Sequence, residues 1–315
     1  MDISIVIPFY NEEESLKELY QEIKRECLNN RYDYEIIFVN DGSYDKSAII
    51  VKELIKKDSN IHLISLRKNF GKALALQIAF KRSKGQIIIT MDADLQDDPS
   101  QIHDFVAKIQ EGYDLVSGWK YNRLDPLEKR LPSKLFNKTI SLLSKVKIHD
   151  FNCGFKAYRK EAAQAIDIYG EMHRYIPVLA SRFGFAITEI PVRHRKRKFG
   201  KSKYGFERYF RGLFDCMSIV FVTKYIERPM YLFGRIALFV LGIGFIICSY
   251  LTILWFSGYS IAGRPLLMLG ILSLILGAQF FSIGLIADIL VKTTFRSNYN
   301  ENYIKEIFTM TDENV

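Results

Sequence analysis

The chain has 315 residues, a formal net charge of +9 and 25% charged residues. Its charged and mixed first two thirds precede a block that is almost wholly apolar, so the average composition conceals a division of the chain. The four cysteines have no paired spacing and the five histidines have no ligand-like spacing. This excludes a disulfide framework and a zinc site.

Short apolar runs alternate with amphipathic stretches from the start of the chain. We expect strands at residues 3–7, 36–39, 61–65, 87–91 and 115–117, and helices at residues 13–28, 47–56 and 72–82. Apolar residues recur at spacings of three and four in the helical stretches, so the pattern indicates an α/β fold with a mostly parallel sheet and helices on both faces. There is no Gly-x-Gly-x-x-Gly after the first strand and no Walker sequence. Neither a dinucleotide site nor a P-loop site is therefore indicated.

Two aspartates, Asp92 and Asp94, follow the fourth expected strand. Alternate residues of a strand share one face, so both carboxylates can turn toward one cation, and Gln96 supplies a third oxygen. Oxygen ligands of this kind suit Mg2+ or Mn2+. An Asp-x-Asp sequence can also simply cap the next helix. Its position at the carboxyl edge of a parallel sheet, where open α/β folds bind ligands, favours the metal site.

Two long segments, residues 236–256 and 266–287, carry no charge. Each is long enough to cross a hydrocarbon core, and neither has the polar face that a helix on a soluble core would show. Basic residues precede and follow the pair, which predicts two transmembrane helices, at about 231–256 and 265–289, with both termini in the cytoplasm. The opening residues have no basic region followed by an apolar stretch, so we expect no signal peptide.

Small residues are spaced at intervals of four in the second uncharged segment. Ser273 with Gly277, and Ala278 with Ser282, would let this helix pack closely against a neighbour. Residues 131–146 and 204–223 mix cations with aromatic and aliphatic residues, which favours helices at a membrane surface. Ordinary amphipathic helices on a soluble domain are the alternative for both stretches.

Ordered motifs in this chain carry a family resemblance. They are Ile7-Pro8-Phe9-Tyr10-Asn11-Glu12, Val39-Asn40-Asp41-Gly42-Ser43-Tyr44-Asp45, Asp92-Ala93-Asp94-Leu95-Gln96-Asp97-Asp98-Pro99, Asn152-Cys153-Gly154-Phe155-Lys156-Ala157-Tyr158-Arg159 and Lys198-Phe199-Gly200-Lys201-Ser202-Lys203-Tyr204. The set resembles the glycosyltransferase family 2 enzymes of the GT-A fold. It is most similar to the polyprenyl-phosphate hexose transferases, which include the bactoprenol glucosyltransferases and dolichyl-phosphate mannose synthase. The resemblance covers the chain up to about residue 290 and implies a GT-A, Rossmann-like sheet followed by interfacial helices and a two-helix transmembrane hairpin.

The resemblance also implies roles for particular residues. The nucleotide-binding set is Pro8, Tyr10, Glu12, Asp41, Lys72 and Asp92, although Asp41 followed by glycine could be turn chemistry alone. The metal set is Asp92, Asp94 and Gln96, and the acceptor-phosphate set is Arg123, Arg130 and Ser133. The loop over the diphosphate contributes Arg197, Ser202 and Lys203, and the sugar pocket contains Asp150, Gly154, Phe155 and Lys156. Asp92, Asp94, Arg130 and Arg197 are the residues implied to be catalytic.

The basic run at residues 193–198 contains further cations besides Arg197. We assign these cations to phospholipid headgroups. A nucleic-acid partner is not indicated, because no aromatic-rich recognition module accompanies the basic run. The implied division of the chain is a cytoplasmic catalytic domain at 1–200, an interfacial helix at 201–230, the two spans at 231–290 and a cytoplasmic tail at 291–315.

The implied reaction is an inverting transfer of a hexose, with UDP-glucose as the expected donor, to undecaprenyl phosphate at the cytoplasmic face of the inner membrane. A phosphate monoester has a second pKa of about 6, so the acceptor is already anionic and needs no strong base. The expected cofactor is Mg2+ or Mn2+, and a homo-oligomer such as a tetramer fits the resemblance. A GDP-mannose-dependent mannose synthase is the alternative enzyme, and an inactive membrane adaptor is the alternative of another class. The Gln-x-x-Arg-Trp signature of processive polysaccharide synthases is absent.

Overall fold

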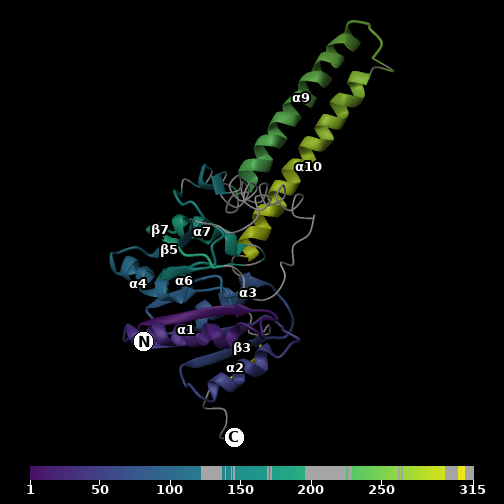
Figure 1. Cartoon of the computed structure of the whole chain (residues 1–315). Helices are drawn as coiled ribbons and strands as arrows, with labels where there is room; N and C mark the ends of the chain where they lie inside the picture. The colour runs from purple at the N-terminus through teal and green to yellow at the C-terminus, as the bar shows by residue number, and fades with distance from the viewer. Residues whose placement is uncertain are drawn as a thin grey trace. The chain divides into compact units, whose positions relative to one another are not determined.

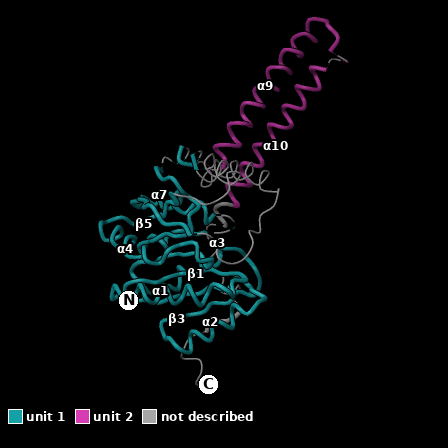
Figure 2. The backbone as a smooth tube through the Cα atoms, in the orientation of Figure 1, with its two compact units in different colours: residues 1–208, 299–315 teal, residues 209–298 magenta. Residues whose placement is uncertain are grey.

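The chain was analysed as a computed structural model (Figure 1). The structure describes residues 1–121, 137–138, 140–142, 144, 146–168, 170, 172–195, 225, 229–261, 263, 265–294 and 304–308. The chain divides into two compact units, residues 1–208 with 299–315 and residues 209–298, which Figure 2 shows in different colours.

The first unit is built on an eight-stranded sheet with the order β7-β5-β6-β4-β1-β2-β3-β8. Its strands are β1 (Ile3–Phe9), β2 (Tyr34–Asn40), β3 (Ile61–Leu66), β4 (Ile87–Thr90), β5 (Leu115–Lys120), β6 (Lys156–Arg159), β7 (Ile187–Val192) and β8 (Ile304–Phe308). Only β6 and β8 run antiparallel to their neighbours. The mostly parallel sheet is therefore confirmed.

All five expected strands are present, and three further strands were not predicted. The β6 strand has only four residues of mixed polarity, and β7 contains Pro191, which an edge strand tolerates because one side needs no hydrogen bonds. The β8 strand lies within residues 291–315, which were expected to form a cytoplasmic tail, and it pairs with β3 at the opposite edge of the sheet.

Helices cover both faces of the sheet. The helices are α1 (Leu16–Asn29), α2 (Ser47–Ile55), α3 (Lys72–Arg82), α4 (Ile102–Gln110), α6 (Lys160–Ala165) and α7 (Ile176–Arg182), with short 3-10 turns η1 (Pro99–Gln101) and η2 (Met172–Tyr175). Alternate residues of β1 pack with α1, α2 and α4 in one continuous core, whereas α3 and α6 lie against the other face, where Phe80 contacts Tyr158. The three expected helices are confirmed, with α1 beginning at Leu16.

The order of the strands creates a switch point beside β1. From β1 the chain continues to β2 and β3 on one side, while β4 pairs with β1 on the other. The Asp41 N–H donates to Phe9 O at 2.9 Å and the Met91 N–H donates to Val6 O at 3.1 Å, so the pairing extends past the ends of β2 and β4. Ligands of open α/β folds bind at such a point, outside the carboxyl ends of the strands.

The second unit contains two long helices, α9 (Met230–Phe256) and α10 (Pro265–Thr294). Met230–Phe256 and Pro265–Leu290 are long and apolar enough to cross a membrane, and only 17% of the most apolar window of each is buried within the unit. Glycines allow close packing of the pair: a Cβ on Gly277 would lie 2.5 Å from Leu241 Cγ, and one on Gly244 would lie 2.9 Å from Leu274 N. The expected packing role of Gly277 is thus confirmed.

The second pair of small residues, Ala278 and Ser282, does not lie in the contact between α9 and α10. Ala278 and Ser282 are exposed within this unit, whereas Ser273 is buried beside Gly277 on the α10 face that contacts α9. The predicted interfacial stretch 204–223 lies outside the described residues, and the stretch 131–146 lies mostly outside them.

Candidate active site

A lysine and an aspartate meet at the carboxyl edge of the sheet. Asp92 lies two residues beyond the end of β4, and Lys72 is the first residue of α3. The Lys72 ammonium donates a hydrogen bond to Asp92 Oδ1 and forms an ion pair with it. The sequence motifs that were expected to hold the donor and the metal therefore converge in the folded chain.

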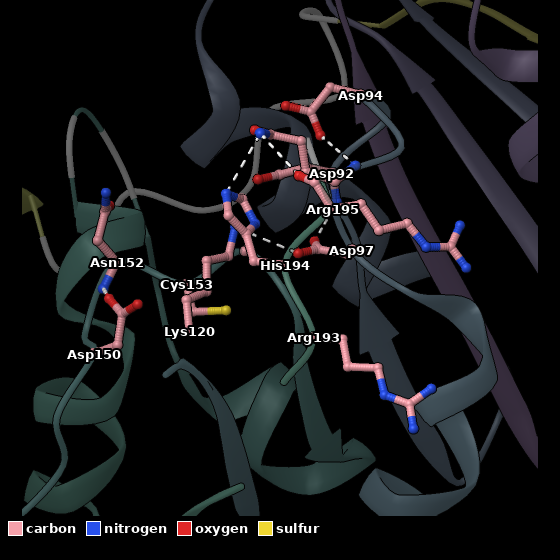
Figure 3. Close-up of polar contacts among 12 residues, drawn as sticks. Asp92, Asp94, Asp97, Lys120, Asp150, Asn152, Cys153, Arg193, His194 and Arg195 are labelled. Atoms are coloured by element: carbon pink, nitrogen blue, oxygen red, sulfur yellow. Dashed lines mark hydrogen bonds and ion pairs between the residues drawn. The ribbon is translucent and has the colours of Figure 1, made fainter. Parts of the chain in front are cut away.

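A second lysine, Lys120, reaches the same edge from the end of β5. Its Nζ lies 3.4 Å from Asp97 Oδ1, and the side chains of the two residues are 13% and 1% exposed. Burial alone would lower the pKa of Lys120, but Asp97 and the neighbouring Asp92 outweigh burial and raise it. The ammonium is therefore a permanent charge in this site (Figure 3).

The two lysines determine the charge state of Asp92. Partial burial disfavours the carboxylate, but Lys72 and then Lys120 attract it, and together they hold the pKa of Asp92 well below its usual range. Asp92 is therefore an anion throughout the physiological pH range, as a cation ligand must be.

Gly154 brings the backbone of the turn before β6 against Asp92. A Cβ on Gly154 would lie 2.4 Å from Asp92 Oδ2, so no other residue fits without displacing the carboxylate. The Thr90 hydroxyl donates to Gly154 O at 2.7 Å and ties β4 to this turn. The predicted sugar-pocket glycine is therefore a direct neighbour of the predicted metal ligand.

The other predicted sugar-pocket residues shape the same turn. The Lys156 ammonium is buried and donates to the backbone carbonyls of Phe151 (3.1 Å) and Cys153. The Asp150 carboxylate accepts from Asn152 N–H at 3.1 Å. The fully buried ring of Phe155 lies 4.2 Å from the ring of Phe105, centroid to centroid, so it belongs to the core rather than to a pocket wall.

Asp41 organises the loop that leads into Lys72. Its two carboxylate oxygens accept from Phe70 N–H at 2.7 Å and Gly71 N–H at 3.0 Å. Gly42 has a φ of 74°, and a Cβ there would lie 2.4 Å from the backbone of Lys68. Burial raises the pKa of Asp41, although the two backbone N–H groups oppose this.

The loop after β1 is fastened to the loop after β2. Asn11, which has a φ of 54°, accepts from Tyr44 N–H at 3.0 Å, and its own N–H donates to Ser43 Oγ at 3.0 Å. The Tyr10 and Tyr44 rings meet edge to face at 6.1 Å between centroids. Tyr10 and Glu12 of the predicted nucleotide set therefore lie on a fixed loop, and Pro8 lies in β1 just before it; the side chains of all three are partly exposed.

Gln96 links the loop after β4 to the segment after β7. Its amide nitrogen lies 3.4 Å from His194 Nε2 and 3.5 Å from Arg195 O, and Arg195 N–H donates to Gln96 O at 2.9 Å (Figure 3). These contacts use the amide nitrogen and leave Oε1 as the group that could face a cation. The predicted partner of Gln96, Asp94, accepts from Gln96 N–H at 3.2 Å.

Arg195 does not have the lipid-facing role expected of the basic run. Its guanidinium forms ion pairs with Glu22 and Asp98, each at 2.7 Å. These pairs attach the segment after β7 to α1 and to the loop after β4. The expectation that Arg195 contacts phospholipid was wrong, because a run of cations in a sequence does not indicate ion-pair partners that are distant in the chain.

The histidine of η2, His173, also lies among the charges of the site. Burial, and then the positive charge of Lys72, lower its pKa to about 3, so the ring is neutral at physiological pH. Its Nδ1 is buried without a hydrogen-bond partner among the described residues. No motif marked His173 or Lys120. The one sequence signal for Lys120 as a site residue was its position: it is a charged residue at the carboxyl end of β5, on the same strand face as Gly118.

The donor set suits a hard divalent cation. Asp92 already holds one cation, the Lys72 ammonium, and Asp94 and Gln96 offer further oxygen atoms on the same loop. No three His, Cys, Asp or Glu side chains of the described residues converge as a metal cluster. A metal ion here would therefore complete its shell with the Gln96 oxygen, water or substrate phosphates, as Mg2+ and Mn2+ do.

Several predicted residues lie outside the described ranges. These are Arg123, Arg130 and Ser133 of the acceptor-phosphate set and Arg197, Ser202 and Lys203 of the diphosphate loop. Their roles stay predictions.

Comparisons with known proteins agree with this geometry. Residues 4–167 match the family model described as glycosyl transferase family 2. The chain is 34% identical to the dodecaprenyl-phosphate galacturonate synthase of Rhizobium johnstonii, over 98% of this chain and 93% of that protein. It is 36% identical to an undecaprenyl-phosphate 4-deoxy-4-formamido-L-arabinose transferase of Pseudomonas fluorescens, over 91% of this chain and 84% of that protein.

Solved structures show the same fold. Glucosyl-3-phosphoglycerate synthase from Mycobacterium tuberculosis, in complex with Mn2+, uridine diphosphate and phosphoglyceric acid, superposes with a TM-score of 0.53 and 18% identity, covering 70% of this chain and 78% of that one. A second mycobacterial protein gives a TM-score of 0.55 at 18% identity, over 70% and 74% of the two chains. At this identity the likeness concerns the fold alone.

Proposed function

Because this chain belongs to glycosyl transferase family 2, we propose that it transfers one sugar from a nucleotide sugar to a polyprenyl phosphate at the cytoplasmic face of the inner membrane. The observation that carries the proposal is the convergence of Lys72 and Lys120 on Asp92 at the switch point between β1 and β4. Two cations beside a carboxylate loop suit a group whose negative charge grows during reaction.

The two lysines act on the leaving group of the donor. Breaking the bond between the sugar and the diphosphate develops negative charge on the departing phosphate oxygen. Lys72 and Lys120 are placed to stabilise that charge, and Asp41 holds the loop of Lys72 in position through the Phe70 and Gly71 amides. A divalent ion held by Asp92, Asp94 and Gln96 would neutralise the same phosphate charge as a Lewis acid.

The nucleophile needs little activation. The phosphate monoester of a polyprenyl lipid is largely anionic at neutral pH, since its second pKa is about 6. In our proposal Arg123, Arg130 and Ser133 orient that phosphate, because the planar guanidinium can make two parallel hydrogen bonds to it. One in-line displacement would invert the configuration at the anomeric carbon. His173, neutral within the site, could donate a hydrogen bond to a sugar hydroxyl without repelling the lysines.

The two apolar helices support a membrane substrate. Helices α9 and α10 satisfy the length and apolarity of membrane spans, and both relatives reported above bear the names of enzymes that act with polyprenyl phosphates. We propose that these helices anchor the catalytic unit where the lipid phosphate lies, with both termini in the cytoplasm as the flanking basic residues predict.

The identity of the sugar is the finer part of the proposal. The expected donor was UDP-glucose, whereas the names of the relatives specify galacturonate and 4-deoxy-4-formamido-L-arabinose. Sugars of this kind differ in one or two substituents, and such differences are read by loop side chains. We retain a uridine diphosphate sugar as the donor class and place UDP-glucose, UDP-galacturonate and the UDP-arabinose derivative together as candidates, with GDP-mannose as the alternative.

A donor panel tests the proposal. The purified full chain is incubated in detergent with Mn2+, a short polyprenyl phosphate and each nucleotide sugar in turn, and the lipid fraction is analysed by mass spectrometry. We expect one donor to give a lipid carrying one sugar, and Asp92→Asn to abolish the product. Asp104→Asn, on the outer side of α4, is the matched control with undiminished product. A protein that binds donors but whose Asp92→Asn variant keeps full activity would contradict the proposed site.

A further inference from the structure

We infer that Lys72 competes with the divalent ion for Asp92: its ammonium holds the carboxylate in the metal-free protein and moves to the diphosphate when the donor binds. This inference rests on the proposed function, because it presumes that the site binds a metal ion and a nucleoside diphosphate. It assigns to Lys72 a role in coupling the two ligands that goes beyond donor binding.

The first support is the contact itself. Lys72 Nζ bonds directly to Asp92 Oδ1, one of the oxygens that a metal ion would need. The predicted metal ligand therefore already has a cation on it. A divalent ion that takes this oxygen must either displace the ammonium or tolerate a like charge at contact distance, and like charges at that distance repel strongly.

The second support is that the Asp92 carboxylate is blocked on the side of Gly154. Its carboxylate rests on Gly154, with only 2.4 Å available between Oδ2 and a Cβ at that position, and its N–H faces Asp97 Oδ2 at 3.4 Å. The carboxylate therefore has no room to follow a moving partner toward the turn before β6. If the pair separates, Lys72 is the member that moves.

The third support is the freedom of the Lys72 side chain relative to its own backbone. Its backbone is held, because the preceding Gly71 N–H donates to Asp41 Oδ2 at 3.0 Å. Its side chain is 29% exposed and is a flexible four-carbon chain with a single ammonium. The backbone anchor and the free chain let the ammonium swing while α3 stays in place.

The other lysine of the site differs in this respect. Lys120 lies 3.4 Å from the buried carboxylate of Asp97, and its side chain is 13% exposed. Moving it would leave the Asp97 charge buried without its partner, which is costly. Lys72 is therefore the exchangeable cation, and Lys120 is the permanent one.

The arrangement predicts coupling between the two ligands. Metal ion alone must displace Lys72 with no anion to receive the ammonium, so it binds weakly. A nucleoside diphosphate supplies that anion, so its presence strengthens metal binding, and by linkage the metal strengthens nucleotide binding to the same degree. Without Lys72, metal ion alone should bind more tightly and the strengthening by nucleotide should be smaller.

The test measures binding of Mn2+ to the full chain in detergent, by calorimetry and by the electron paramagnetic resonance signal of free Mn2+, with and without UDP and, in parallel, GDP. We expect Lys72→Met to bind Mn2+ alone on the order of 2- to 5-fold more tightly than the wild type, the range for loss of a partly exposed ion pair. Lys72→Arg, which keeps a cation, should retain the wild-type affinity. Lys68→Met removes an exposed cation from the same loop without contacting Asp92, and it should also leave the affinity unchanged.

A change of Mn2+ affinity in the opposite direction overturns the inference. If Lys72 instead positions Asp92 for the metal ion, Lys72→Met binds Mn2+ as weakly as the wild type or more weakly. Lys72→Gln serves as a second variant, and equal thermal midpoints without Mn2+ confirm that each protein is folded. A wild-type protein that binds neither Mn2+ nor nucleotide contradicts the proposed function itself. Wild-type binding with unchanged Mn2+ affinity in Lys72→Met and Lys72→Gln contradicts this inference alone.

Discussion

Gly154 lies directly beneath the carboxylate of Asp92, so close that a Cβ on the glycine would be 2.4 Å from Asp92 Oδ2. Gly154→Ala should therefore displace the carboxylate. A shift of this kind costs about 10- to 100-fold in activity, because catalysis depends on the placement of the charged groups. Lipid product formation and Mn2+ affinity should both fall.

The matched control for Gly154→Ala is Gly242→Ala in α9, where an added Cβ meets no atom within 4 Å. Circular dichroism of both variants checks that the fold is retained. Full activity in a folded Gly154→Ala protein would mean that Asp92 does not need its present position.

Asp41→Asn should weaken donor binding. The carboxylate receives two backbone N–H groups, and an amide can accept only one of them while its NH2 group faces the other. Losing a hydrogen bond to a charged acceptor should raise the KM for the nucleotide sugar about tenfold or more, with a smaller effect on kcat. Asp104→Asn, which changes an exposed carboxylate, should leave KM unchanged. An unaltered KM for Asp41→Asn in a folded protein would show that the carboxylate serves the turn alone.

Gly277→Val should destabilise the α9 and α10 pair. The added side chain would overlap Leu241, and overpacking of this kind costs about 1–3 kcal/mol. The midpoint of thermal unfolding in detergent should fall by roughly 3–10 °C. Ala278→Val, at the adjacent exposed position, should leave the midpoint almost unchanged. Equal midpoints for the two variants would show that the helices do not pack through Gly277.

The pH dependence of stability should include a contribution from His62 on β3. Burial, opposed by Glu35 and reinforced by Lys84, lowers the pKa of this imidazole from 6.5. The unfolded chain therefore binds a proton at this imidazole more readily than the folded chain does. The resulting contribution to folding stability is fully present above about pH 6.5 and is lost as the pH falls below that value. The unfolding constant changes by at most tenfold per pH unit from this group.

Thermal midpoints of the wild type and His62→Gln at pH 7.5 and pH 5.5 measure this contribution. The wild type should lose more stability between the two pH values than the variant does. A pH response of His62→Gln as steep as that of the wild type would rule the contribution out.

Local patterns in the sequence were sufficient for much of the fold. Apolar runs located β1 to β5, and three-and-four spacing located α1, α2 and α3, because these signals depend on neighbouring residues. The Asp92 loop could be placed at the carboxyl edge for the same reason. Its neighbours could not all be found: Lys120 and His173 arrive from β5 and η2, elements that carry no motif and are distant in sequence.

Arg195 shows that a local sequence pattern can also indicate the wrong partner for a residue. Its charge suggested a membrane surface, but Glu22 and Asp98 are the groups that it binds. Pairing across more than 170 residues follows from the position of β7 in the sheet, and β7 itself was missed because it contains a proline and polar residues. The site thus depends on topology that a local pattern does not encode.

The central claim is that a lipid phosphate attacks the sugar and a nucleoside diphosphate leaves from beside Asp92 and Lys72. The most direct test identifies both products of one reaction, the lipid by mass spectrometry and the nucleotide by chromatography, with the active donor and a short polyprenyl phosphate. We predict a polyprenyl monophosphate sugar and a nucleoside diphosphate in equal amounts, both absent with Asp92→Asn. A polyprenyl diphosphate sugar with release of a nucleoside monophosphate, or no lipid product from any donor with the folded wild type, would contradict the claim.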